Sequence, residues 1–187
     1  MKTFITAIAA TLMFSTSGFA TEFDAPLQGL ATTELAGIAA KPEIVAAVQA
    51  QNVQHGEIGQ ARIDELDATW RAEAGSGGAL VNATLGKDTS VLLRKIQEEG
   101  DGIYTEIFVM DNVGLNAAQS GVTSDYWQGD EAKWPVPFNQ NTTHFSDVEL
   151  DQSTQTYQSQ ISLPVLNEAG QPIGAVTFGV NIEMLMQ

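Results

Sequence analysis

The chain has 187 residues, of which 43% are hydrophobic and 17% charged, and it contains no cysteine. Eight Lys and Arg residues against 23 Asp and Glu residues leave a formal charge of -15. Nucleic-acid binding needs clustered cations that displace counterions from phosphates, so this composition excludes a nucleic-acid partner. The lack of cysteine excludes disulfide frameworks and thiolate metal sites. The composition therefore predicts one acidic globular domain.

The first 20 residues have the order of a secretory signal peptide. Lys2 gives a positive start, an apolar run extends from Phe4 to Phe14, and small residues lead to Ala20. At about 1.5 Å per residue, that run is too short to cross a hydrocarbon layer of about 30 Å. The sequence therefore predicts a signal peptide over residues 1–20 and a periplasmic or secreted chain without a membrane anchor of its own. Residues 21–187 are expected to form a single domain.

Residues 26–74 have the composition of a helical arm, rich in alanine, leucine and glutamate, with no alternating segment. Proline is tolerated in a first helical turn but not in a helix interior, so one helix is expected to end at Lys41 and the next to start at Pro42. A second break is expected in the glycine-containing segment 56–59. The glycine run at residues 75–78 is expected to end the arm.

Residues 79–187 are predicted to form the core of the domain, in which a short helix precedes a sheet. The helix is expected from about residue 88 to the glycines at 100 and 102. The hydrophobic period then changes from 3.6 to 2, which is the pattern of half-buried strands. Five segments are predicted as strands: 103–110, 115–120, 144–150, 157–165 and 173–180. The predicted fold class is therefore α+β, with a five-stranded antiparallel sheet and helices on one face.

The connection at residues 121–143 is too long for a simple turn, and long ordered connections are usually functional. It holds Tyr126, Trp127 and Trp134, so two of the three tryptophans of the chain lie in it. Large aromatic side chains normally lie in a core or in a binding pocket. Two interpretations stay open: the tryptophans enclose a ligand, or they only fix the loop to the sheet.

The order of these elements and two sequence segments resemble the extracytoplasmic Cache, or PDC, sensor domains, which have a PAS-like sheet. The segments are SDYWQGDEAKW, at residues 124–134, and QISLPVLNEAGQPIGAVTFGVN, at residues 160–181. The second contains Ser162-Leu163-Pro164-Val165 at the end of one strand, a hairpin turn, and Ile173-Gly174-Ala175 at the start of the last strand. The resemblance extends over residues 27–185 and implies a free-standing, single Cache domain.

This resemblance implies a small metabolite as ligand, either an amino acid, an amine or a small organic acid, bound against the sheet beneath the aromatic loop. Carried over by position, the family pocket would use Tyr126, Trp127, Lys133 and Trp134 of the loop, with inward-facing strand residues such as Tyr104 or Phe108, Ser159 and Phe178. The loop itself adds Asp125 and Asp130 as candidate binding residues. The acidic groups beside Trp127 would receive an ammonium group, and Lys133 would pair with a carboxylate. Considered from the residues alone, these charges could instead form a solvated loop surface.

A free-standing sensor domain would have to signal through a separate partner. The expected partner is a membrane receptor, a kinase or a transporter. The helical arm at residues 26–74 is expected to supply a dimerisation or partner surface, so that a homodimer would form through it.

No sequence pattern in this chain indicates an enzyme, a metal site or a cofactor. His55 and His144, the only histidines, lie in different segments without the spacing of a zinc site. The chain also lacks a nucleophile elbow and a phosphate-binding loop. Catalytic residues, metals and cofactors are therefore predicted to be absent. Two alternatives stay open: a small periplasmic hydrolase that uses Asp and Glu carboxylates, and a ligand-free interaction module.

Overall fold

The structure, a computed structural model, describes residues 22–151 and 155–187, so the predicted signal peptide lies outside the described residues. The helical arm comprises α1 (Asp24–Leu30), the π-helical segment η1 (Ala31–Leu35), α2 (Ala36–Ala39), α3 (Pro42–His55) and α4 (Gln60–Glu73). Its breaks fall where proline and glycine predict them. Lys41 is the extended N-cap of α3, and Pro42 is the first residue of that helix. Proline fits there because a first-turn N–H has no intrahelical partner to lose.

Two helices connect the arm to the sheet: α5 (Ala79–Leu85) and α6 (Asp88–Glu99). The sequence predicts α6 but not α5. The carboxylate of Glu73 accepts hydrogen bonds from the amides of Leu80 and Val81, at 2.8 and 3.0 Å. It thereby satisfies two of the N–H groups that the first turn of a helix leaves without partners. The start of α5 is thus stabilised by the last residue of α4, across the glycine run between them.

The sheet is antiparallel throughout. It contains β1 (Tyr104–Met110), β2 (Asn116–Gln119), β3 (His144–Phe145), β4 (Glu149–Leu150), β5 (Tyr157–Leu166) and β6 (Pro172–Asn181). The strand order is β2-β1-β6-β5-β3, and β4 also pairs with β5. The last strand is therefore central, between the first strand and the fifth. Together with the helices, this confirms the predicted α+β fold with a PAS-like antiparallel sheet.

The segment predicted as one strand over residues 144–150 is divided into β3 and β4, both paired with β5. Between them, the hydroxyl of Ser146 accepts a hydrogen bond from the backbone N–H of Gln160 at 2.8 Å. A side chain thus occupies a position where a regular ladder would use a backbone carbonyl. The aromatic connection also contains a short helix that the sequence does not predict, α7 (Pro135–Gln140), and α8 (Ile182–Leu185) follows the last strand.

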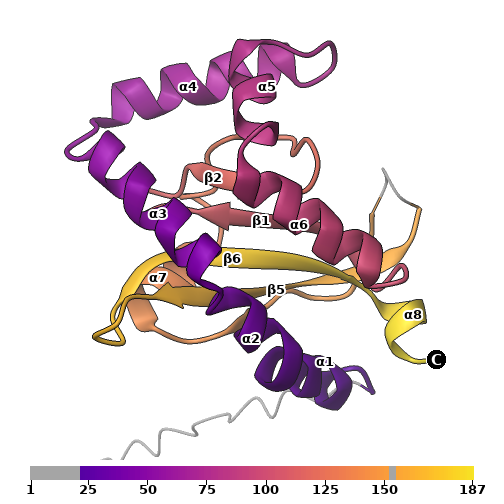
Figure 1. Cartoon of the computed structure of the whole chain (residues 1–187). Helices are drawn as coiled ribbons and strands as arrows, with labels where there is room; N and C mark the ends of the chain where they lie inside the picture. The colour runs from indigo at the N-terminus through magenta and orange to yellow at the C-terminus, as the bar shows by residue number, and fades with distance from the viewer. Residues whose placement is uncertain (1–21, 152–154) are drawn as a thin grey trace, which may run out of the picture.

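Helices α1 to α3 run diagonally across one face of the sheet, with α6 beside them, and α7 lies behind the sheet (Figure 1). On the helix-covered face, strand residues such as Ile107, Val109 and Phe178 are buried against Leu35 and Ile44 of the arm. The apolar side of the first half of the arm is therefore used within the chain, as a cover for the sheet. Among the described residues, no helix is long and apolar enough to cross a membrane.

The start of β6 lies against both a neighbouring strand and the arm. A Cβ atom added at Gly174 would collide with the carbonyl oxygen of Met110 on β1 and would lie 2.8 Å from Cγ1 of Val48 on α3. Both groups are buried in the middle of the molecule. Glycine at position 174 therefore allows β6 to approach both β1 and α3 closely.

A second, smaller core holds α4 and α5 against the end of the sheet near β2. Trp70 of α4 is fully buried, and its ring is stacked on Tyr126 with 5.2 Å between ring centroids. The Trp70 indole N–H donates to the carbonyl of Thr123 at 2.8 Å. The beginning of the aromatic connection is therefore fixed by the arm as well as by the sheet.

Candidate functional site

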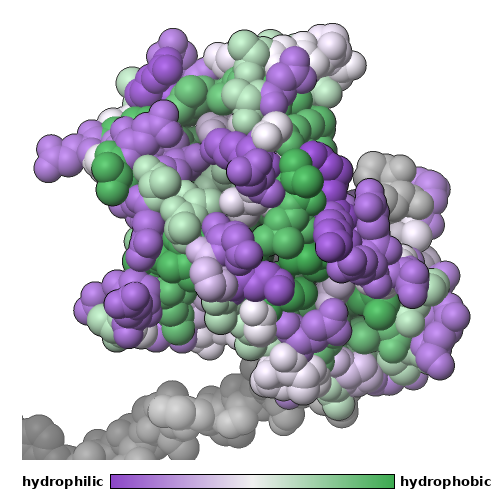
Figure 2. Space-filling model, viewed as in Figure 1, coloured by the Kyte–Doolittle hydropathy of each residue, from purple (hydrophilic) through white to green (hydrophobic). Residues whose placement is uncertain are grey.

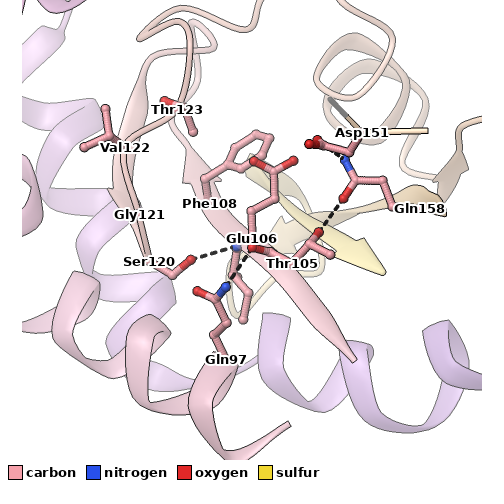
Figure 3. Close-up of a pocket in the computed structure, with 11 residues that line it drawn as sticks. Gln97, Thr105, Glu106, Phe108, Ser120, Gly121, Val122, Thr123, Asp151 and Gln158 are labelled. Atoms are coloured by element: carbon pink, nitrogen blue, oxygen red, sulfur yellow. Dashed lines mark hydrogen bonds between the residues drawn. The ribbon is translucent and has the colours of Figure 1, made fainter. Parts of the chain in front are cut away.

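A cleft of about 600 Å³ lies on the sheet face that α1 to α3 do not cover. We call it the sheet-face cleft and define it by Glu106, Phe108, Lys133, Gln158 and Gln160, all of which line it. The strand residues come from β1 and β5, and Lys133 comes from the aromatic connection. Because side chains alternate along a strand, Glu106 and Phe108 lie on the side of β1 opposite to Ile107. Figure 3 shows both of them on this side.

Hydrogen bonds hold the polar floor of the sheet-face cleft in place. The Gln160 side-chain amide donates to Glu106 Oε1 at 2.9 Å. The Gln158 side-chain N–H donates to Asp151 Oδ2 at 2.9 Å, and its side-chain oxygen accepts from the Thr105 hydroxyl (Figure 3). Burial raises the pKa of the Glu106 carboxyl, and the Gln160 hydrogen bond and the Lys133 charge oppose this shift. The Glu106 carboxylate is thus a desolvated acceptor with a fixed orientation.

Lys133 is 13% exposed and is ion-paired with Glu131 at 3.0 Å. Its ammonium lies 5.6 Å from the centroid of the Phe108 ring, within the range of a cation–π contact. Lys133 is the only lysine or arginine that lines this cleft in the part of the chain described, whereas Glu106, Glu131 and Asp151 all lie in it or at its edge. The cleft therefore carries more negative than positive charge.

The two loop tryptophans are hydrogen-bonded to the turn between β1 and β2. The Trp127 indole donates to the carbonyl of Val113 and the Trp134 indole to that of Asp111, each at 2.8 Å. Trp134 is stacked on Phe138 and packs against the cluster that contains Phe108. Both indoles thus fix the aromatic connection to the sheet, as one of the two sequence interpretations describes, and Trp134 also supports the Phe108 side of the cleft.

The structure brings only some of the ten predicted site residues together. Phe108 and Lys133 line the cleft, and Trp134 packs beside it. Tyr104 and Phe178 belong to the core on the helix-covered face, where the Tyr104 hydroxyl donates to Glu34. These two aromatic residues therefore support the arm from the other side of the sheet.

The remaining predicted residues also have other surroundings. The Ser159 hydroxyl donates to the carbonyl of Ser146 at 2.9 Å, on the side of β5 that carries Ile161. The Asp125 carboxylate is paired with Arg71 at 2.8 Å, and Tyr126 is stacked on Trp70. Asp130 is exposed. The polar floor instead comes from Glu106, Gln158 and Gln160, which sequence reasoning missed. Their signal was present, because polar residues 158 and 160 alternate with Ser159 and Ile161 along one strand.

His144 gives a prediction that tests the surroundings of the cleft. Burial lowers the pKa of its imidazole below the ordinary value of 6.5, and the nearby Lys133 charge lowers it further. We expect an NMR titration to place the His144 midpoint below that of an exposed histidine. Lys133→Gln should raise this midpoint, whereas Lys95→Gln, on the exposed side of α6, should not. An unchanged midpoint in Lys133→Gln would show that the ammonium does not lie near the imidazole in solution.

Within residues 22–151 and 155–187, no group of three His, Cys, Asp or Glu side chains is placed to hold a metal ion. The hydrogen bonds of the sheet-face cleft are instead those of a polar site with one aromatic wall. Such a site orients a small ligand through a few fixed acceptors and donors.

No family model and no curated protein sequence matches this chain. Several solved structures are similar to it. The E. coli DcuS sensor domain is 16% identical, with a TM-score of 0.48, over 88% of this chain and 97% of that chain. The sensor domain of the V. cholerae histidine kinase DctB is 13% identical, with a TM-score of 0.40, over 84% of this chain and 58% of that chain.

A third similar structure is the ligand-binding domain of the Pseudomonas aeruginosa amino acid chemoreceptor PctC, in complex with GABA. It is 16% identical, with a TM-score of 0.42, over 72% of this chain and 63% of that chain. This chain thus spans most of the length of the DcuS domain and about three fifths of the length of the other two.

Proposed function

We propose that this chain is an exported, single Cache-type sensor domain that binds a small metabolite and passes its ligand state to a separate partner. The observation that carries the proposal is the sheet-face cleft, in which the half-buried Glu106 carboxylate and two glutamine side chains lie beside the Phe108 ring. The PAS-like sheet and the two sequence segments support the Cache-type assignment. The signal-like order of residues 1–20 supports export, and residues 21–187 would form the one domain.

The charge of the cleft favours a ligand with an ammonium group. Glu106 and Asp151 lie at the cleft with hydrogen-bonding glutamines beside them, while the single lysine is already paired with Glu131. An ammonium group would gain charge-assisted hydrogen bonds from these carboxylates and contact the face of the Phe108 ring. Amines and amino acids therefore fit better than plain carboxylates. In an amino acid, the carboxylate would lie towards Lys133.

The proposal is tested with n-butylammonium as the probe, by calorimetric titration and by the NMR signal of His144, which lies in the adjoining end of the cleft. Glu106→Gln keeps the shape of the side chain but removes its charge. We expect it to weaken binding by about tenfold, the effect of losing one charge-assisted hydrogen bond. The control is Glu98→Gln on the exposed side of α6, which should bind like the parent.

Two outcomes would contradict the proposed site. Either n-butylammonium leaves the His144 signal unchanged at millimolar concentration, or Glu106→Gln and Glu98→Gln bind equally well. Binding of n-butylammonium and of a broader panel of amines and amino acids without chemical change would support the sensor over the hydrolase. A complete lack of binding across that panel would favour the ligand-free interaction module.

Signalling is proposed to require a membrane receptor, a kinase or a transporter as the separate partner. The arm remains the proposed surface for this partner or for a homodimer. Because Leu27, Leu35 and Ile44 already cover the sheet, such a contact would have to use the outer side of the arm. Val53 of α3 is 85% exposed on that outer side. Figure 2 shows hydrophilic residues spread over this face of the molecule, with smaller hydrophobic patches between them.

A further inference from the structure

A second cavity, of about 700 Å³, lies where α3, α4, α5 and the start of α6 meet, away from the sheet-face cleft. We call it the arm cavity. Its polar lining includes Gln51, His55, Thr84, Lys87 and Tyr126. Gln51, Thr84 and Tyr126 are almost completely buried. The hollow is thus bounded by side chains from α3, α4 and α5, by Lys87 at the N-cap of α6, and by the aromatic connection.

Lys87 is the central cation of the arm cavity. Its ammonium donates to Gln51 Oε1 at 3.0 Å and to the Ala117 carbonyl at 2.8 Å, which uses two of its three N–H bonds. Burial lowers the pKa of this ammonium, and only the charge of Asp111 opposes the shift. Lys87 forms no ion pair with any described residue. A partly buried ammonium therefore has a donor left for an anion.

His55 lies beside it in the same lining. Its Nδ1 is 2.6 Å from Oδ2 of the fully buried Asp111, which fixes the orientation of the ring. Its Nε2 has no hydrogen-bond partner in the described part of the chain. The Asp111 oxygens are already occupied by Gln51, His55 and two backbone amides, those of Val113 and Leu115. The carboxylate behind the cavity is thus committed to the protein rather than available to a ligand.

The arm cavity differs from the sheet-face cleft in its charge. Two of the eight Lys and Arg residues of the chain line it, Arg62 and Lys87. Arg62 is half-exposed and ion-paired with Glu65, so Lys87 is the cation in this lining that is left for a ligand. Glu57 is the one acidic residue in that lining. This is the reverse of the sheet-face cleft, where acids outnumber the single lysine. The lining also has an apolar part, which consists of Ile58, Leu66, Leu80 and Ala83.

We propose that the arm cavity is a second binding site, for a small aliphatic carboxylate whose anionic end pairs with Lys87 and whose carbon chain lies against Leu66 and Leu80. The Lys87 ammonium supplies a charge-assisted hydrogen bond, and the hydroxyls of Thr84 and Tyr126 supply neighbouring polar contacts. The phenol is a neutral group at physiological pH, since burial raises the pKa of Tyr126 to about 12. The apolar part of the lining makes the site selective for carboxylates with a short chain over inorganic anions.

The test uses butyrate as the probe and n-butylammonium as a control with the same carbon chain and the opposite charge. The chain has two histidines: His55 lines the arm cavity, and His144 lies in the adjoining end of the sheet-face cleft. A His144→Gln variant assigns the two imidazole signals in an NMR spectrum. We expect butyrate to shift the His55 signal and n-butylammonium to leave it unchanged. Acetate should bind more weakly than butyrate, by up to about fourfold per methylene removed.

Two variants locate the site. Lys87→Gln should weaken butyrate binding by about tenfold or more, whereas Lys95→Gln on the same helix should not change it. Ala83→Phe leaves Lys87 in place and fills the cavity from an exposed position, so it should abolish the His55 shift in a folded protein. The proposal is overturned if butyrate does not shift His55 at millimolar concentration, if n-butylammonium or sulfate shifts it as strongly, or if Lys87→Gln and Lys95→Gln bind alike. None of these results depends on amine binding in the sheet-face cleft.

Discussion

Replacing Asp111 with alanine is expected to lower the free energy of unfolding by about 3–5 kcal/mol, because several hydrogen bonds to one buried side chain are lost at once. The Asp111 side chain is fully buried and accepts hydrogen bonds from Gln51 and from the amides of Val113 and Leu115, and it is 2.6 Å from His55. Alanine would leave His55 Nδ1 and the amides of Val113 and Leu115 without this acceptor, and it would leave the Gln51 side-chain amide with only the Leu115 carbonyl, at 3.4 Å. Urea unfolding measures the loss.

Two further variants identify its cause. Asp111→Asn keeps an oxygen that can accept from Val113 and Leu115 but removes the charge opposite His55, so it should fall between the parent and Asp111→Ala. Asp130→Ala removes the same charge from an exposed loop position and should change stability by less than about 0.5 kcal/mol. If Asp111→Ala were no less stable than Asp130→Ala, the hydrogen bonds of Asp111 would not hold the β1–β2 turn to α3 of the arm.

Gly174→Ala is the second substitution with a large expected effect, a destabilisation of about 3 kcal/mol or more, at or above the top of the usual range for an overfilled core. The added methyl would collide with the Met110 carbonyl on β1 and press on Val48 of α3. Neither can move without separating a strand or a helix from the centre of the sheet.

The matched control is Gly37→Ala in α2, where an added Cβ meets no atom within 4 Å. Alanine is favoured over glycine in a helix, so this variant should be as stable as the parent or more stable by about 0.5 kcal/mol. Thermal and urea unfolding of both variants measure the difference. Equal stability of the two would mean that β6 does not approach β1 and α3 as closely as described.

Most of the fold was predictable because it follows from local rules. Pro42 starts a helix, glycines end the arm, and a change of period from 3.6 to 2 marks the start of the sheet. Three helices were missed: α5, α7 and the one-turn α8. The first two are short and lie among residues that usually break helices, because Gly78 precedes α5 and α7 begins at Pro135. Their stability comes in part from contacts outside the helices themselves, such as those of the Glu73 carboxylate at the start of α5.

The candidate site was less predictable because it depends on which face of the sheet each side chain reaches. Strict alternation from Phe108 would place Tyr104 in the same cleft. A register shift between Tyr104 and Glu106 instead turns Tyr104 to the helix-covered face. In the same way, Phe178 lies opposite Ile107 and Ile161, a register that only the paired strands define. The hydrogen bond between Glu106 and Gln160 depends on β1 and β5 lying on either side of β6, which the sequence alone does not show.

The central position of β6 has a consequence for how the chain reaches its fold. The strand is the last in sequence, yet it pairs with both β1 and β5. The sheet therefore cannot close until residues 172–181 are available, and its β1–β6 contacts span a large sequence separation. Such non-local closure slows folding. A chain interrupted before Pro172 would present the facing edges of β1 and β5 unpaired, which is the form in which strands recruit other chains and aggregate.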